Sequence, residues 1–294
     1  MKPLLKVVRK GVFSSLQDNG RFGYRRFGIP TAGPMDRLSF QLGNKIAENT
    51  KGNAALEIFY GGMTFQSVAT HEYILVGANM NATVNGSGIE PWKTFVLKEG
   101  DLLKLKFSPE GAIAYLIPLG GFKGEEMLNS QSTYLKAGIG CPVMEGIILY
   151  GENLPPNKYR KGLYPKWIPS FSDAKEVRVV VSHHIHYFKD QDIERFFSSN
   201  YQLSAGDRMG YCLKGLPIHT NRKVDLLSEP TMFGTIQVPP NGQPIVLMAD
   251  AQTVGGYPTI GKIVEEDLWK VAQLRIGDCI SFRKETFDGK AIYD

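Results

Sequence analysis

The feature that most constrains the fold of this chain is a decapeptide pattern that occurs twice. "RFGYRRFGIP" at 21–30 and "RMGYCLKGLP" at 208–217 both fit Arg-x-Gly-Tyr-x-x-x-Gly-x-Pro. Glycines, a proline and a tyrosine at fixed spacing are an unusual combination. The second copy therefore suggests that the chain contains two related halves.

Further matches follow the decapeptide in the same order and with similar offsets. Together they indicate an internal duplication of about a hundred residues, too long a period for a solenoid. We expect two similar domains, 1–170 with an extended arm and linker, and 171–294. The matched segments are "ALE" ending at Glu57 with "LSE" ending at Glu229, "ILVGANMNAT" from Ile74 with "IVLMADAQTV" from Ile245, and "LKEGDLLKL" from Leu97 with "LRIGDCISF" from Leu274.

Short apolar segments separated by turn residues run through both halves. Such spacing is typical of antiparallel barrels or sandwiches, so we expect a mainly β protein. Leu-x-x-Gly-Asp precedes a strand in each half, and predicts a tight turn in which Gly has a positive φ and Asp binds the backbone. The expected strands are Leu4–Val8, Tyr73–Val76, Thr94–Leu97, Leu102–Phe107, Ala112–Pro118, Val177–Val181, Gly234–Val238, Pro244–Ala249 and Cys279–Phe282.

Helices are expected to be few and short. Met35, Leu38, Leu42 and Ile46 share one face at helical spacing, and Asp36 stands near the start of that segment. Two further candidate helices are Phe188–Phe197 and Val264–Leu274.

Composition excludes several classes of protein. With 294 residues, 43% apolar and 21% charged, the chain has ordinary soluble composition. The net charge of +5 includes no Lys/Arg run long enough for a nucleic-acid patch. Cys141, Cys212 and Cys279 lie far apart without CxxC spacing, which favours a reducing cytoplasm over a disulfide framework or structural zinc. No apolar run approaches the roughly 20 residues of a membrane helix.

Familiar catalytic signatures are missing from the sequence. It contains no P-loop, no H-E-x-x-H, no nucleophile elbow, and no G-x-G-x-x-G between strand and helix. "SHHIHYF" places His183, His184 and His186 close together. In a strand, His184 and His186 would project to one face, as two ligands of a metal site would. No Cys or further His cluster completes such a site. Polar residues at a strand end are the simpler interpretation, and no metal site is expected.

The densest polar and Gly-rich stretches lie elsewhere. Arg21 and Arg208 offer planar forks for a carboxylate or a phosphate. Asp250 and Gln252 lie two residues apart, so in an extended chain they share a face. The stretches are 17–36, 205–215, 235–244 and 248–261.

Gly255 and Gly256, followed by Tyr257, would let the backbone approach a ligand closely. A structural role stays open, because these glycines and aspartates also build turns and a repeated Arg and Tyr would equally brace a barrel. "ADAQTVGGYP" has no full counterpart in the first half, where the chain contains "GANMNATVNG". That asymmetry favours a ligand role for the second-half segment.

Six segments of this chain resemble the KipA-like family of biotin-dependent carboxyltransferase-type domains. The family includes the C subunit of bacterial 5-oxoprolinase, proteins like the second allophanate hydrolase subunit, and part of the carboxyltransferase domain of urea carboxylase. The resemblance spans nearly the whole chain. The segments that carry it are "LQDNGRFGYRRFGIPTAGPMD", "AALE", "STYLKAGIGC", "GDRMGYCLKG", "LLSEPTMFGTIQVPPNGQPIVLMADAQTVGGYPTIG" and "DLWKVAQLRIGD".

The resemblance implies a fold and an activity. It implies two cyclophilin-like antiparallel β-barrel lobes, and as partners a KipI-like B subunit and a LamB/YcsF-like A subunit. It further implies ATP-dependent opening of 5-oxo-L-proline to L-glutamate. Because the sequence contains no P-loop, we expect ATP with Mg²⁺ to bind at an atypical site shared with the partner subunit. The chain has no Ala-Met-Lys-Met tetrapeptide, so no covalently attached biotin is expected.

Roles for the candidate residues follow from this activity, which needs donors for anions and a carboxylate for proton transfer. The predicted catalytic residues are Arg208, Asp250 and Glu229, and the predicted substrate- or nucleotide-binding residues are Arg21, Asp36, Gln237, Gln252, Gly255, Gly256 and Tyr257. Two alternatives stay open. One is a KipA-like regulator that antagonises a KipI-like kinase inhibitor, and the other is the carboxyltransferase component of a biotin-dependent urea or amide carboxylase.

Overall fold

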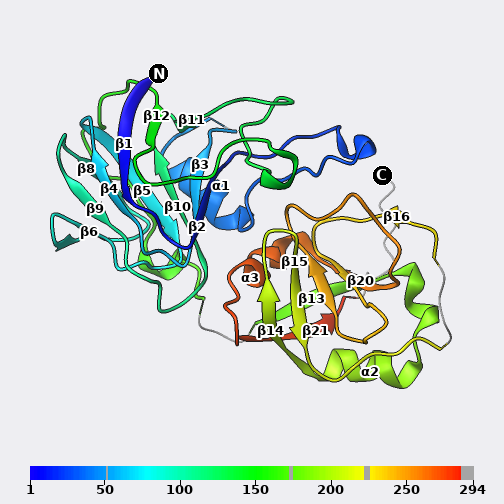
Figure 1. Cartoon of the computed structure of the whole chain (residues 1–294). Helices are drawn as coiled ribbons and strands as arrows, with labels where there is room; N and C mark the ends of the chain where they lie inside the picture. Colours follow the sequence, from blue (N-terminus) through cyan, green and yellow to red (C-terminus); the bar gives the residue numbers. More distant parts are fainter. Residues whose placement is uncertain (51, 172–174, 222–225, 286–294) are drawn as a thin grey trace, which may run out of the picture. The chain divides into compact units, whose positions relative to one another are not determined.

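The computed structural model describes residues 1–50, 52–171, 175–221 and 226–285 (Figure 1). The described chain consists mainly of short strands with few helices, which confirms the mainly β prediction. Every predicted strand overlaps an observed one. No helix in the described residues is long and apolar enough to span a bilayer.

By its internal contacts the chain divides into two compact units, of which the first is Met1–Asp173. This unit contains two open antiparallel sheets. In spatial order the five-stranded sheet contains β2 (Phe13–Gln17), β3 (Ala55–Phe59), β10 (Ile113–Pro118), β5 (His71–Gly77) and β8 (Thr94–Leu97). The seven-stranded sheet contains β11 (Phe122–Lys123), β12 (Ile148–Gly151), β1 (Lys2–Arg9), β4 (Thr64–Ser67), β9 (Leu102–Lys104), β6 (Thr83–Val84) and β7 (Ser87–Gly88).

The prediction of a closed barrel for this first unit is therefore wrong, and burial explains why. Every residue of β3, β5 and β10 is buried, whereas a barrel strand facing solvent alternates between buried and exposed positions. One apolar core joins the two sheets and includes Leu5, Phe65, Leu75 and Leu116. A helix, α1, packs against β5 and β10. The central strands are thus covered on both faces in a layered structure.

Helix α1 (Arg37–Ile46) is the helix expected near Asp36, but it buries a different face. The Asp36 carboxylate caps it by accepting hydrogen bonds from the Ser39 main-chain nitrogen at 2.9 Å and the Ser39 hydroxyl at 2.6 Å. A Cβ at Gly43 would lie 2.6 Å from the Ile117 side chain, so this glycine lets the helix approach the sheet closely. The buried residues are Ser39, Phe40, Gly43 and Asn44, while Leu38, Leu42 and Ile46 are only partly buried.

The second unit, Ala174–Asp294, contains the closed barrel that the resemblance implies. It is not wholly antiparallel, because β13 and β21 pair in parallel. An odd number of strands cannot alternate in direction all the way round, so one parallel pair is unavoidable. The barrel contains, in order, β13 (Glu176–Val181), β20 (Thr259–Ile263), β17 (Thr235–Gln237), β18 (Ile245–Leu247), β15 (Gly210–Lys214), β14 (Asn200–Gly206) and β21 (Cys279–Lys284).

Smaller elements complete the second unit. A two-stranded ribbon pairs β16 (Glu229–Pro230) with β19 (Val254–Gly255). Helix α2 (Asp190–Ser198) packs on β21, where the rings of Phe196 and Phe282 stack at 4.5 Å. The helix expected over 264–274 is a 3₁₀ turn followed by α3 (Leu268–Ala272). The 3₁₀ turns of the chain include η1 (Arg25–Phe27), η2 (Leu135–Ala137), η3 (Pro165–Trp167), η4 (His183–Tyr187) and η5 (Glu265–Asp267).

The two Leu-x-x-Gly-Asp turns have matching structures, which confirms the predicted geometry. Gly100 and Gly277 adopt φ values of 89° and 97°. Asp101 and Asp278 each accept a hydrogen bond from the main-chain nitrogen three residues earlier, at 2.7 Å and 2.9 Å. Each turn also exchanges two main-chain hydrogen bonds of 2.8 Å with one partner, Ser67 for the first turn and Leu203 for the second.

The two decapeptides, in contrast, differ in secondary structure. Residues 21–30 form a loop that contains η1, whereas residues 208–217 pass into strand β15. Tyr24 is half-buried in the first copy. Tyr211 of the second copy is buried, and its hydroxyl donates to the Ala272 carbonyl at 3.3 Å. The repeated pattern therefore does not produce a repeated element.

Candidate functional site

Arg208 and Asp250, both predicted to be catalytic, form a buried ion pair in the second unit. Arg208 lies in the turn between β14 and β15, and Asp250 follows β18. The guanidinium donates from Nε to Oδ2 at 2.9 Å and from Nη2 to Oδ1 at 2.8 Å. The Asp250 amide also donates to the Arg208 carbonyl at 2.7 Å. Backbone and side chain together fix this two-pronged geometry.

The pair is nearly closed to solvent, with side chains 7% and 10% exposed. Two hydrogen bonds between opposite charges compensate much of the cost of removing them from water. Each carboxylate oxygen of Asp250 has a second lone pair that can accept another hydrogen bond. The pair therefore holds the planar guanidinium of Arg208 in a fixed orientation beside the Asp250 carboxylate.

Gln237 and Gln252 form a second pair of candidate residues in the second unit. Gln252 Nε2 donates to Gln237 Oε1 at 3.2 Å, which orients the Gln237 carboxamide. Gln237 is 2% exposed, and within the described residues its Nε2 has no hydrogen-bond partner. A Cβ at Gly255 would lie 2.5 Å from that nitrogen, so the glycine leaves room for the amide. A buried donor without an acceptor is costly, and such groups commonly serve a ligand or a water.

Glu229, the third predicted catalytic residue, lies opposite Gly255 in the β16–β19 ribbon. Its Oε2 is 3.2 Å from His183 Nε2 and 3.4 Å from His184 Nε2. Burial lowers the pKa of His184, and the neighbouring His183 lowers it further, against an opposing effect of Glu229. The histidines lie in the 3₁₀ turn η4 and not in a strand, so the pair that converges is His183 with His184 and not His184 with His186.

Sequence adjacency and these contacts group most second-unit candidates. Gln252 follows Asp250 by two residues and donates to Gln237, Gly255 faces Gln237 Nε2, and Glu229 pairs with Gly255 across the ribbon. Gly256 and Tyr257 follow the ribbon, and Tyr257 is 48% exposed. We call the set of Arg208, Asp250, Gln237, Gln252, Gly255 and Glu229 the barrel cluster.

Arg21 and Asp36 belong to the first unit and make local contacts there. Arg21 is fully buried, and its guanidinium donates to the Ser132 carbonyl. Ser132 is held in turn by Asp18, whose Oδ1 accepts from the serine hydroxyl at 2.6 Å. Asp36 is the cap of α1. Both contacts fit a structural role.

A buried network around Glu57 was not singled out by the sequence as a site. The Tyr115 hydroxyl donates to Glu57 Oε2 at 2.6 Å and accepts from the Asp36 amide at 2.9 Å. Burial, followed by the charges of Glu57 and Asp36, raises the pKa of Tyr115 well above its usual value. The tyrosine therefore stays a neutral donor. The matched "ALE" and "LSE" segments were the only sequence signal for Glu57.

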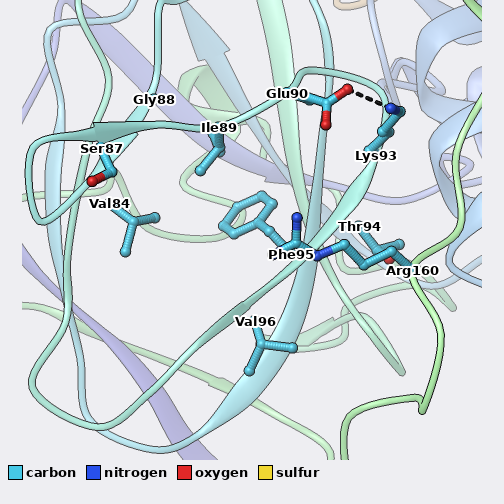
Figure 2. Close-up of a pocket in the computed structure, with 10 residues that line it drawn as sticks. All are labelled: Val84, Ser87, Gly88, Ile89, Glu90, Lys93, Thr94, Phe95, Val96 and Arg160. Carbon is cyan, nitrogen blue, oxygen red and sulfur yellow. Dashed lines mark hydrogen bonds and ion pairs between the residues drawn. The ribbon is translucent and has the colours of Figure 1, made fainter.

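A pocket in the first unit was also missed by the sequence. It has a volume of about 280 Å³, and Figure 2 shows Lys93, Arg160 and Glu90 among its lining side chains. Lys93 pairs with Glu90. A second pocket of about 370 Å³ in the same unit is lined partly by Cys141. None of the predicted site residues lines either pocket.

Comparison with known proteins identifies the family. The family model of the carboxyltransferase domain, subdomain A and B, matches residues 27–284. This chain belongs to that family. The C subunit of 5-oxoprolinase from Escherichia coli (strain K12) is 34% identical over 282 residues, covering 95% of this chain and 90% of that protein. The same protein of Haemophilus influenzae is 35% identical, covering 92% and 87%.

These matches confirm the resemblance to the 5-oxoprolinase C subunit, a component of an enzyme. Other relatives carry the same region within longer chains. Urea amidolyase of Saccharomyces cerevisiae is 28% identical over 95% of this chain but only 16% of its own length. The crystal structure of TTHA0988 has a TM-score of 0.88 and 29% identity, with 96% of this chain covering 56% of that one. The K. lactis urea amidolyase structure also reaches 0.88, with 28% identity over 97% of this chain and 19% of that one.

Proposed function

We propose that this chain is the C subunit of an ATP-dependent 5-oxoprolinase, which hydrolyses 5-oxo-L-proline to L-glutamate. The observation that carries the proposal is the 34% identity to the Escherichia coli C subunit over nearly the full length of both chains. In the proposed complex the chain acts with a KipI-like subunit and a LamB/YcsF-like subunit. Its free, exposed cysteines suit the cytoplasm that we propose as its compartment.

The chemistry explains why a nucleotide is needed. A lactam carbonyl is a poor electrophile because amide resonance stabilises it. ATP, when bound with Mg²⁺, would supply a phosphoryl group to the lactam oxygen and leave as ADP, which makes the carbonyl carbon electrophilic enough for water to add. The ring C–N bond then breaks as the nitrogen takes up a proton, and hydrolysis of the acyl phosphate gives L-glutamate and phosphate. The sequence contains no P-loop, so we propose that the nucleotide site is shared with the KipI-like subunit.

The barrel cluster supplies groups that fit such a substrate. We assign the unpaired Nε2 of Gln237 as a donor to a substrate oxygen, since a carbonyl or carboxylate there would complete its hydrogen bonding. Arg208 stabilises anionic charge at the edge of the cluster. The Asp250 carboxylate fixes the orientation of the Arg208 guanidinium through two hydrogen bonds.

The remaining candidates have supporting roles in this proposal. Glu229 is half-buried and accessible, and is our candidate for proton transfer at the ring nitrogen or the attacking water. Gln252 orients Gln237, and Gly255, Gly256 and Tyr257 form the wall against the substrate.

Reconstitution tests the proposal. We expect no 5-oxoproline-dependent ATP hydrolysis from the purified chain alone, and turnover when the KipI-like and LamB/YcsF-like subunits are added together. Each pairwise mixture serves as a control. A complex of all three proteins that forms but lacks 5-oxoproline-dependent turnover would argue against the proposed activity. Turnover by the chain alone would argue against the shared site.

Carboxyl transfer from carboxybiotin is the second candidate. The observation that favours it is the family itself, together with the urea amidolyase structure that matches 97% of this chain. This chain would then need a separate biotinylated protein. A biotinylated protein that copurifies with the chain, detected on a streptavidin blot, would support this candidate.

A further inference from the structure

Three metal-binding side chains converge beside the barrel cluster. They are His183 and His184 of η4 and Glu229 of β16, and we call them the His–His–Glu triad. The two elements are far apart in sequence and meet only in the folded second unit. The candidate ligand atoms all lie within 4.8 Å of one another.

Two of the three spacings between the ligand atoms match a tetrahedral metal ion, and the third, between the two imidazole nitrogens, lies within 4.8 Å. With metal–nitrogen and metal–oxygen bonds of about 2.0–2.1 Å, two ligand atoms of a tetrahedron lie roughly 3.3–3.4 Å apart. The distances from Glu229 Oε2 are 3.2 Å to His183 Nε2 and 3.4 Å to His184 Nε2. The carboxylate is therefore already at the spacing that an ion bound to either ring would require.

His184 is held in place by hydrogen bonds behind its ring. Its side chain is 5% exposed, and its Nδ1 lies 3.1 Å from Thr259 Oγ1. Thr259 Oγ1 lies 2.6 Å from the Ser182 hydroxyl oxygen, which also accepts from the His184 amide at 3.1 Å. The Thr259 amide also donates to Nδ1 at 3.4 Å, so in the metal-free arrangement Nε2 carries the proton and faces Glu229. Binding of an ion at Nε2 shifts that proton to Nδ1, which then donates to Thr259 Oγ1, the kind of hydrogen bond that orients the ring in many zinc sites.

The ligand types select the class of metal. Two imidazoles and one carboxylate suit zinc, cobalt or nickel, whereas Mg²⁺ and Ca²⁺ prefer oxygen ligands. Three protein ligands leave a fourth position open, as in catalytic zinc sites. The His183 side chain is 72% exposed and that of Glu229 45%, so this position is accessible to solvent.

We propose that His183, His184 and Glu229 bind one transition-metal ion of the zinc class, with the fourth position open to water or a substrate oxygen. The site rests on the positions of these three side chains and differs from the Mg²⁺ that accompanies ATP; because Oε2 of Glu229 would bind the ion, the other carboxylate oxygen would carry the proton transfer assigned to this residue above. The competing arrangement is a metal-free one in which Glu229 accepts hydrogen bonds from both rings.

Cobalt(II) titration of the tag-free, metal-stripped chain tests the site. We expect one equivalent to bind with the intense visible absorption of tetrahedral cobalt, and zinc to displace it. His184→Asn and Glu229→Gln should each abolish the signal, while the control His219→Asn, at an exposed histidine outside the triad, should retain it. Thermal unfolding with and without zinc should show a rise in Tm for wild type and the control only.

Thr259→Val tests the hydrogen bond behind the His184 ring. It should weaken cobalt binding by about 10- to 100-fold and keep the stoichiometry, because the ligands remain but the ring is less well oriented. Absence of tetrahedral absorption in the wild type would overturn the proposal. So would an unchanged signal in the triad variants, or a thiolate charge-transfer band that assigns the cobalt to a cysteine.

Discussion

The two arginines of the repeated decapeptide have different partners. Arg21 lies in a loop of the first unit and donates to a main-chain carbonyl, that of Ser132. Arg208 lies in a strand turn of the second unit and donates to a carboxylate, that of Asp250. A carbonyl partner fixes a loop, whereas a carboxylate partner places a cation and an anion side by side in a site that can act on a ligand.

The matched glutamates show the same contrast. Glu57 is fully buried and accepts from the Tyr115 hydroxyl and the Met35 amide. Glu229 is half-exposed and faces two histidines. In the first unit these positions serve the core, while in the second unit they belong to the barrel cluster and the triad. Matched segments thus make structural contacts in one unit and candidate-site contacts in the other.

The largest expected effect comes from breaking the buried ion pair. Asp250→Ala leaves a buried guanidinium without its carboxylate, and should lower the free energy of unfolding by about 3–5 kcal/mol. Combining it with Arg208→Met removes the uncompensated charge and should recover part of the loss. Urea unfolding of both variants measures this. Additive losses in the double variant would mean that the two side chains do not stabilise each other.

A smaller loss of stability is expected when Gly255 in the β16–β19 ribbon is substituted. Gly255→Ala places a methyl group 2.5 Å from Gln237 Nε2, so the carboxamide must move. We expect a stability loss of about 1–3 kcal/mol and weaker substrate binding by the reconstituted complex. Gly256→Ala is the matched comparison, because it adds a methyl group to the same wall but its new Cβ, 3.4 Å from its nearest neighbour, would leave Gln237 in place. Equal KM values for the two variants would show that Gln237 does not contact substrate.

The smallest effect is expected at Asp36. If this residue only caps α1, Asp36→Ala should cost about 1 kcal/mol of unfolding free energy and Asp36→Asn less, because asparagine also caps helices. Neither change should alter the KM for 5-oxoproline. A rise in KM with Asp36→Asn, measured in the reconstituted complex, would restore the ligand role that the sequence suggested.

Local features of the fold were predictable, but long-range pairing was not. The Leu-x-x-Gly-Asp turns follow from conformational rules that act within a few residues, and Gly100 and Gly277 obey them. The continuous apolar runs of β5 and β10 were compatible with strands buried on both faces, but whether the sheet edges meet and close depends on pairing between distant strands, which the local sequence does not specify. The face that α1 buries depends on Gly43, because a side chain at this position would collide with Ile117 of the sheet beneath the helix.

The candidate site was only partly predictable for the same reason. Arg208 and Asp250 were recognised as candidates, yet their pairing depends on the neighbouring strands β15 and β18. The His–His–Glu triad was missed because Glu229 reaches η4 only through tertiary structure, and because "SHHIHYF" was interpreted as a strand end. Residue types indicated which side chains suit a ligand, and tertiary structure decided which of them meet.

One comparison tests the central claim, that the second copy of the decapeptide carries the chemistry. Arg21→Lys and Arg208→Lys each keep the charge but lose the planar fork. In reconstituted complexes of equal assembly and thermal stability, kcat/KM for 5-oxoproline should fall on the order of 100-fold for Arg208→Lys and stay near wild type for Arg21→Lys. Equal losses in the two variants, or a loss confined to Arg21→Lys, would contradict this account.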